Sequence, residues 1–212
     1  MNTTNNNKTI MIMAGGTGGH VYPAIAVADV LRTNSFNVVW LGNKNSFESE
    51  VVPNAGYSLE YISISGLRGK NILSLISLPF KILSSIFQAY KIFKNHKPVF
   101  VLGMGGYVSG PGAIAARILK IPLIIHEQNS IPGFTNRVVS RFATAVLVAF
   151  PNAFNNKLNT IYTGNPIRES IAKLPKPDIR FAKHTGNIKL LVLGGSLGAK
   201  YLNDCLPNSI SL

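Results

Sequence analysis

The feature that most constrains the fold of this chain is a pattern that occurs three times: an apolar strand, a glycine-rich loop and a helix. The three copies occupy residues 9–31, 99–119 and 188–206. Alternating strands and helices predict a parallel sheet with right-handed crossovers, whose ligands bind at the carboxyl ends of the strands. Four further apolar segments supply the other strands of one domain: 36–42, 123–129, 144–150 and 159–166. The sequence therefore predicts an α/β fold with a doubly wound, Rossmann-like parallel sheet.

The first glycine loop, AGGTGGH, joins a buried strand to a helix in which we expect Pro23 in the first turn. Its glycines permit close approach of a ligand, and a helix N-terminus favours an anion such as diphosphate. A tight turn without a ligand has the same glycines. The loop lacks the Gly-Lys-Ser/Thr of a P-loop, and a G-x-G-x-x-G pattern begun at Gly16 reaches Val21. His20 is either a capping or packing residue or a general base.

Two further segments place polar groups at the same predicted edge. The loop GMGGYVSGP is a second anion-type loop, in which Tyr107 and Ser109 offer hydroxyl donors. The segment HEQNSIPGFTNR follows a buried strand, and its amides and charged groups favour recognition of a hydroxyl-rich molecule such as a sugar. Within it, Glu127 is either an ionised functional carboxylate or half of a structural ion pair with an arginine.

The third copy of the pattern predicts a second anion-binding half. Arg168, in YTGNPIR, follows the last predicted strand of the first domain and suits a planar clamp on phosphate. Ser196, in GGSLGA, adds a hydroxyl to another glycine loop. Two anion-binding halves that face one cleft suit group transfer between two phosphorylated substrates.

Charge and composition restrict the partners. The net charge is +13, and between Tyr61 and Arg168 twelve Lys and Arg accompany a single acid. Such a surface favours phosphate in a nucleic acid, an anionic lipid or a substrate. No helix-turn-helix or RNA-binding aromatic pair is visible, so we expect no nucleic acid partner. Cys205 is the only cysteine, and no Asp-x-Asp motif occurs, so we expect no disulfide framework, metal or other cofactor.

Residues 71–98 contain an amphipathic segment of mixed character. Pro79 and Lys81 interrupt it, so it is too broken for a transmembrane helix. Five of its apolar residues share helical spacing and are accompanied by lysines: Ile82, Ile86, Phe87, Tyr90 and Phe93. The segment is either a crossover helix that faces the core or a surface that rests on an anionic membrane, and different faces can do both.

The order of AGGTGGHVYPAIAVA, GMGGYVSGP, HEQNSIPGFTN, TGNPIR and GGSLGA closely resembles the MurG family of bacterial N-acetylglucosaminyltransferases. The resemblance covers about the first three-fifths of such an enzyme. It implies a GT-B architecture, with an acceptor domain and a donor domain around a cleft. It also implies inverting, metal-independent transfer of N-acetylglucosamine from UDP-N-acetylglucosamine to the 4-hydroxyl of the muramoyl sugar of lipid I, which gives lipid II for peptidoglycan. The implied location is peripheral, at the cytoplasmic face of the bacterial inner membrane.

The resemblance also implies roles for individual residues. His20 and Glu127 are the candidate catalytic residues. Those implied to contact UDP-N-acetylglucosamine are Thr17, Gly18, Gly19, Asn129, Arg168 and Ser196, and those implied to serve the acceptor are Gly105, Gly106, Tyr107 and Asn136. Partners implied are UDP-N-acetylglucosamine, lipid I and an anionic membrane surface.

We expect three segments: a polar lead at 1–9, an acceptor and membrane-associating domain at 10–163, and a linker with the beginning of a donor domain at 164–212. The first domain is then complete and the second only begun, so we expect little transferase activity from these residues alone. One alternative is a non-catalytic acceptor half of a split glycosyltransferase. Another is a GT-B transferase for a different lipid acceptor, such as diacylglycerol. A dinucleotide-dependent oxidoreductase is disfavoured by the failed G-x-G-x-x-G pattern.

Overall fold

The structure, a computed structural model, describes residues 8–64, 77–154, 158–182, 184–194 and 199–210. The chain divides into two compact units, residues 1–169 and residues 170–212, which are described separately. In the first unit, seven strands form one sheet: β1 (Thr9–Ala14), β2 (Asn37–Asn43), β3 (Ser58–Ile62), β4 (Phe100–Gly105), β5 (Leu123–Glu127), β6 (Ala145–Val148) and β7 (Ile161–Tyr162). Helices of this unit are α1 (Gly18–Thr33), α2 (Phe47–Asn54), α4 (Leu78–His96), α5 (Ser109–Ile118) and α6 (Phe134–Val139).

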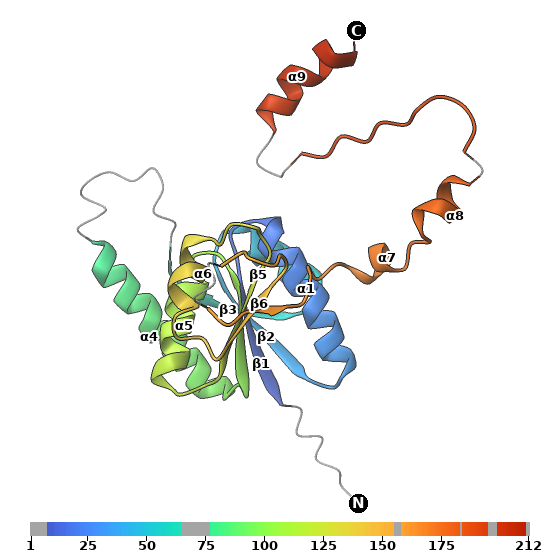
Figure 1. Cartoon of the computed structure of the whole chain (residues 1–212). Helices are drawn as coiled ribbons and strands as arrows, with labels where there is room; N and C mark the ends of the chain where they lie inside the picture. Colours follow the sequence, from blue (N-terminus) through green and yellow to red (C-terminus); the bar gives the residue numbers. More distant parts are fainter. Residues whose placement is uncertain (1–7, 65–76, 155–157, 183, 195–198, 211–212) are drawn as a thin grey trace, which may run out of the picture. The chain divides into compact units, whose positions relative to one another are not determined.

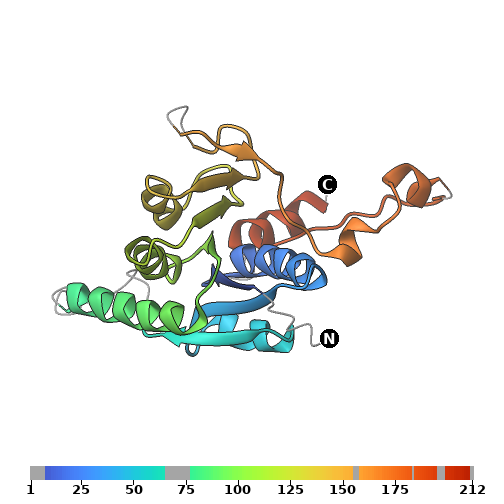
Figure 2. The ribbon, with the colours of Figure 1, turned by 90° about the horizontal axis from the view of Figure 1, so that it is seen from below.

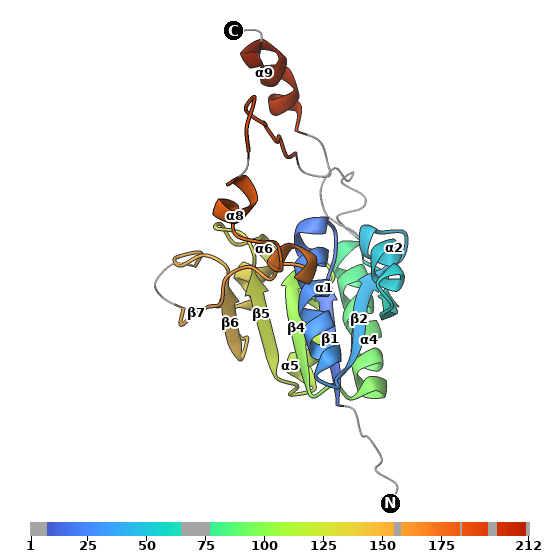
Figure 3. The ribbon, with the colours of Figure 1, turned by 90° about the vertical axis from the view of Figure 1, so that its right-hand side faces the viewer.

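The sheet order is β3-β2-β1-β4-β5-β6-β7, and every neighbouring pair is parallel. This order reverses direction at β1 and β4, where an open α/β sheet presents its ligand crevice. Figure 3 shows the strands side by side with their arrowheads at one end of the sheet. The predicted Rossmann-like fold is therefore confirmed.

Helices cover both faces of the sheet because β1 is apolar on both sides. Met11 and Met13 belong to the cluster that includes α4 and α5, whereas Ile10 and Ile12 belong to the cluster that includes α1. All four side chains are fully buried, which is typical of a central parallel strand. Figures 1 and 2 show α1 on one side of the sheet and α4, α5 and α6 on the other.

The start of α1 differs from our expectation. The helix begins at Gly18, so Pro23 lies in its second turn and not its first. A proline there has no N–H for the carbonyl of the residue four positions earlier, Gly19. The helix nevertheless begins at the glycines, with the N–H groups of His20 and Val21 both donating to the Thr17 carbonyl at 3.1 and 3.2 Å.

The second unit contains α8 (Pro177–Phe181) and α9 (Lys200–Ile210), while α7 (Glu169–Ala172) begins at the boundary. The strand predicted at 188–194 is not formed, and this part of our expectation is wrong. Its apolar side chains are exposed, and Ile188 retains 94% of its accessible surface. A parallel strand needs neighbours for its backbone hydrogen bonds, and the described residues of this unit provide none.

Among the described residues, no helix is both long enough and apolar enough to span a membrane. The polar lead is described only from Lys8 onward.

Candidate functional site

A cavity of about 460 Å³ opens where three loops meet at the carboxyl ends of β1, β4 and β5. The loops are 15–17, 105–107 and 133–136, and His20 from the first turn of α1 also lines the cavity. The fold thus brings together six of the residues singled out from the sequence: Thr17, His20, Gly105, Gly106, Tyr107 and Asn136.

Two N–H groups of the first glycine loop donate to other parts of the protein. Gly15 donates to the Gly105 carbonyl at 3.3 Å, and Gly16 donates to Oε2 of Glu48 at 3.0 Å. The N–H groups of Thr17, Gly18 and Gly19 have no acceptor among the described residues. Because these three precede or begin α1, they form the part of the loop that can receive an anion.

The second glycine loop requires glycine for two reasons. Gly105 and Gly106 have φ of +107° and +86°, which side-chain-bearing residues rarely adopt. A Cβ on Gly106 would lie 2.2 Å from the Gly15 carbonyl oxygen, so the two loops touch through their backbones. The Ser109 hydroxyl, which we expected to face a ligand, is buried and donates toward the carbonyls of Met13 and Gly105 at 3.1 and 2.9 Å.

Tyr107 is half-buried beside this contact. Its ring lies 3.5 Å from the position that a Cβ on Gly16 would occupy. Burial raises the pKa of the Tyr107 hydroxyl, and the negative charge of Glu48 raises it further. A hydrogen bond with the Asn43 side chain lowers this pKa by less, so the hydroxyl keeps its proton at neutral pH.

Glu127 is fully buried and does not line the cavity. Its Oε1 accepts from the backbone and side-chain nitrogens of Asn129, both at 2.9 Å. Its Oε2 accepts from the Gly133 N–H at 3.1 Å and from Nδ2 of Asn136 at 2.9 Å. The carboxylate thus ties the loop after β5 into a fixed shape, and its partners are amides, where we had weighed an arginine.

Asn136 carries an unusual polar atom. The side chain is only 2% exposed, and Nδ2 donates to Glu127 and to the His126 carbonyl at 3.2 Å. Its Oδ1 is buried without a hydrogen-bond partner among the described residues. A buried acceptor left unpaired costs about 1–3 kcal/mol, and it lies in a residue that lines the cavity.

Two other donor-side residues, Asn129 and Arg168, do not line this cavity. Asn129 is exposed but held by Glu127. The Arg168 guanidinium lies over the ring of Tyr22 on α1, with 5.1 Å from Cζ to the ring centroid. Ser196 lies outside the described residues.

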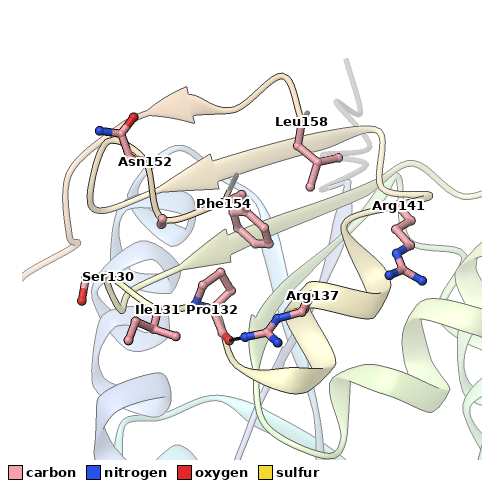
Figure 4. A pocket seen from close by; sticks show the side chains of 9 residues that line it. Ser130, Ile131, Pro132, Arg137, Arg141, Asn152, Phe154 and Leu158 are labelled. Carbon is pink, nitrogen blue, oxygen red and sulfur yellow. Dashed lines mark hydrogen bonds between the residues drawn. The ribbon is translucent and has the colours of Figure 1, made fainter. Parts of the chain in front are cut away.

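A second cavity of about 700 Å³ lies beside α6 and the segment that follows β6. Figure 4 shows Arg137 and Arg141 over apolar walls formed by Pro132, Phe154 and Leu158. Arg137 donates to the Pro132 carbonyl at 3.2 Å. None of the residues implied by the sequence motifs lines this cavity.

Helix α4 has two distinct faces. Ser85, Ala89 and Phe93 are buried against the unit. Phe80, Leu83 and Phe87, at 57–75% exposure, form an exposed apolar row, and the Lys91 ammonium lies 4.4 Å from the Phe87 ring centroid.

Comparison with known proteins agrees with this fold. The model of the glycosyltransferase family 28 N-terminal domain matches residues 10–148, and the chain belongs to this family. It is 48% identical over 205 residues to UDP-N-acetylglucosamine--N-acetylmuramyl-(pentapeptide) pyrophosphoryl-undecaprenol N-acetylglucosamine transferase of Haemophilus influenzae strain PittGG, covering 97% of this chain and 58% of the relative. The enzyme of the same name from Nitrosomonas europaea is 49% identical over 203 residues, covering 95% and 57%.

The crystal structure of Acinetobacter baumannii MurG superposes with a TM-score of 0.77 at 40% identity, covering 96% of this chain and 57% of that one. The resemblance drawn from the five motifs is therefore confirmed. The chain spans about 58% of the length of the curated relatives it matches.

Proposed function

We propose that residues 10–163 form the acceptor domain of a MurG-type N-acetylglucosaminyltransferase and that 164–212 begin its donor domain. The observation that carries this proposal is the 460 Å³ cavity, in which both glycine loops meet His20 and Asn136, a residue whose buried Oδ1 has no hydrogen-bond partner among the described residues. A sugar hydroxyl or amide N–H is the kind of donor that Oδ1 lacks. The acceptor that the relatives' names describe, a muramyl pentapeptide on an undecaprenyl diphosphate, carries such groups beside a diphosphate.

The proposed reaction is an inverting transfer. The 4-hydroxyl oxygen of the muramoyl sugar forms a bond to the anomeric carbon of N-acetylglucosamine, and the bond from that carbon to the UDP oxygen breaks. The hydroxyl proton passes to the His20 ring, and the electron pair of the broken bond leaves with UDP. The unpaired N–H groups of Thr17, Gly18 and Gly19 stabilise the charge that develops on the leaving diphosphate.

We assign Glu127 a positioning role, because its two oxygens already accept four hydrogen bonds and it is sealed from the cavity. It holds Asn129 toward the donor and Asn136 toward the acceptor. Arg168 and Ser196 complete the donor side in this proposal.

Titration of the 212-residue chain with a water-soluble lipid I analogue tests the acceptor assignment. The reference ligand is a matched lipid diphosphate without sugar and peptide. We expect selective binding of the analogue and an affinity about 2- to 10-fold lower for Tyr107→Phe, which removes the hydroxyl group of a residue that lines the cavity. Tyr61→Phe, away from the cavity, is the matched control. Equal binding of both ligands would reduce the site to a basic surface that binds diphosphate.

We further propose that the exposed row on α4 rests on an anionic membrane, with the protein peripheral to the cytoplasmic face of the bacterial inner membrane. Phe80, Leu83 and Phe87 offer the apolar contact, and Lys91 lies beside them as a group for anionic headgroups.

Sedimentation with vesicles tests this membrane surface. We expect binding to phosphatidylglycerol vesicles but not to phosphatidylcholine vesicles, and loss of binding in Phe80→Ser/Phe87→Ser. Val30→Ser, which removes an exposed apolar side chain from α1, is the control and should bind normally. Unchanged binding of the double variant would remove α4 from the proposal.

A further inference from the structure

A continuous chain of hydrogen bonds runs behind the cavity from His20 to Gly164. Nδ1 of His20 lies 2.9 Å from Oε1 of Gln128, and Nε2 of Gln128 lies 3.0 Å from Nδ1 of His126. Nε2 of His126 lies 3.0 Å from the Gly164 carbonyl oxygen. The chain links α1, the strand end of β5 and the loop after β7.

The Gly164 carbonyl at one end sets the direction of every hydrogen bond in this chain. The Gly164 carbonyl can only accept, so His126 carries its proton on Nε2 and accepts at Nδ1 when neutral. The Gln128 amide nitrogen donates to that Nδ1 and also to the His126 carbonyl oxygen at 3.0 Å. This second bond fixes the amide orientation independently, and Oε1 must then face His20.

An amide oxygen accepts and cannot donate, so the partner nitrogen on His20 carries a proton. In a neutral imidazole only one nitrogen is protonated, and a proton on Nδ1 leaves Nε2 as the basic atom. His126 and Gln128 are 3% and 5% exposed, so water does not compete with these bonds. Burial also lowers the pKa of His126, which keeps it in the neutral form that the chain needs.

We propose that Gln128 and His126 are positioning residues that hold His20 in the Nδ1–H tautomer and so make Nε2 the atom that accepts the substrate proton. The part concerning the substrate rests on the proposed function, whereas the tautomer is a property of the chain itself.

The test is nitrogen NMR of the histidine-labelled 212-residue chain at a pH where the imidazoles are neutral. Two-bond proton–nitrogen correlations distinguish a protonated ring nitrogen from an unprotonated one, and single replacements assign the histidines. We expect His20 as the Nδ1–H tautomer and His126 as the Nε2–H tautomer. His96, whose Nε2 lies 2.7 Å from Oε1 of Glu60, is an internal reference with its proton on Nε2.

Two variants of Gln128 separate positioning from general support of the fold. Gln128→Met fills the space without an acceptor, so the His20 tautomer should move toward the mixture of free histidine. Gln128→Glu restores an acceptor for His20 but removes the donor to His126, so the Nδ1–H form of His20 should return. Gln88→Met on α4 is the matched control and should leave His20 unchanged.

An Nε2–H tautomer of His20 in the unaltered chain would overturn the inference, as would an unchanged His20 in folded Gln128→Met. Failure of the lipid I titration with the expected tautomers present would overturn the proposed function and leave the positioning chain intact. The two failures are therefore distinguishable.

Discussion

Glu48 and Glu127 are both fully buried at the carboxyl edge of the sheet, one on the β2 side of the cavity and one on the β5 side. Neither forms an ion pair with a cationic side chain among the described residues. Glu48 accepts two backbone N–H groups, from Gly16 at 3.0 Å and Asn43 at 3.2 Å. Glu127 accepts four donors from one loop. Each carboxylate serves as an anchor for a binding loop, and they differ in how much of that loop depends on them.

The two carboxylates also affect their surroundings differently. A carboxylate beside Gly16 repels an anion there, so only the part of the first loop from Thr17 onward is suited to an anion. On the β5 side, amide donors form hydrogen bonds with the Glu127 carboxylate. The bond from Nδ2 of Asn136 orients that side chain, and its Oδ1 has no partner among the described residues. The β2 side therefore shapes the loop, while the β5 side also holds a buried acceptor atom that has no partner among the described residues.

Removal of Glu127 has the largest expected effect. Glu127→Leu removes four hydrogen bonds to a charged group, each worth about 1.5–3 kcal/mol, and water offsets part of the loss at the exposed residues Asn129 and Gly133. We expect the free energy of unfolding to fall by about 3–5 kcal/mol, measured by urea titration. Glu127→Gln, which retains one acceptor oxygen, should lose less. A loss below about 1 kcal/mol for Glu127→Leu would remove its role as an anchor.

The contact between the two glycine loops ranks next. Gly106→Ala adds a methyl group 2.2 Å from the Gly15 carbonyl oxygen at a φ of +86°. We expect a loss of about 2–4 kcal/mol in the free energy of unfolding, because backbone atoms must move. Gly110→Ala is the control, since its added Cβ meets only a methyl group of Thr135 at 3.8 Å. Equal losses in both variants would show that the loops are not held in contact.

Glu48→Gln should lower the free energy of unfolding less than Glu127→Leu or Gly106→Ala does. The amide keeps one acceptor for Gly16 or Asn43, so about 1–2 kcal/mol is expected from the loss of one bond and the charge. Hydrogen exchange locates the effect: protection should fall at Gly16 and Asn43 but not at Gly133. A loss larger than that of Glu127→Leu would reverse the ranking of the two anchors.

The sequence predicted much of the fold because the central strands are continuous apolar runs bounded by glycine loops. It did not reveal β3, whose residues Ser58 and Glu60 interrupt the apolar pattern of a half-buried edge strand. It did not reveal α2 either, an eight-residue helix with acids in its first turn. Nothing in the local sequence marks Glu48, because its role depends on a loop 32 residues earlier.

The candidate site, like the fold, was predicted only in part. Glycine loops identified the cavity, since backbone requirements leave a strong residue signature at Gly105 and Gly106. The roles of Glu127 and Gln128 depend on their burial and on their hydrogen-bond partners. Residue spacing in the sequence predicts neither. From the sequence, Glu127 was a candidate catalytic carboxylate or an ion-pair partner, and its four amide donors are those of a residue that anchors a loop.

The smallest expected effect concerns pH and also distinguishes the two sides of the cavity. Burial lowers the pKa of His126 from the usual 6.5, against smaller opposing effects of the Gly164 carbonyl and the charge of Glu127. The unfolded chain then binds more protons below pH 6.5, so stability from this group is full above 6.5 and is lost as pH falls toward the lowered value. Between pH 7.5 and 5.5, the unaltered chain should lose about 1 kcal/mol more than His126→Gln in urea titrations. The Glu48→Gln variant retains His126 and should show the same loss as the unaltered chain. If the free energy of unfolding changes equally with pH in the unaltered chain and in His126→Gln, a neutral, buried His126 is contradicted.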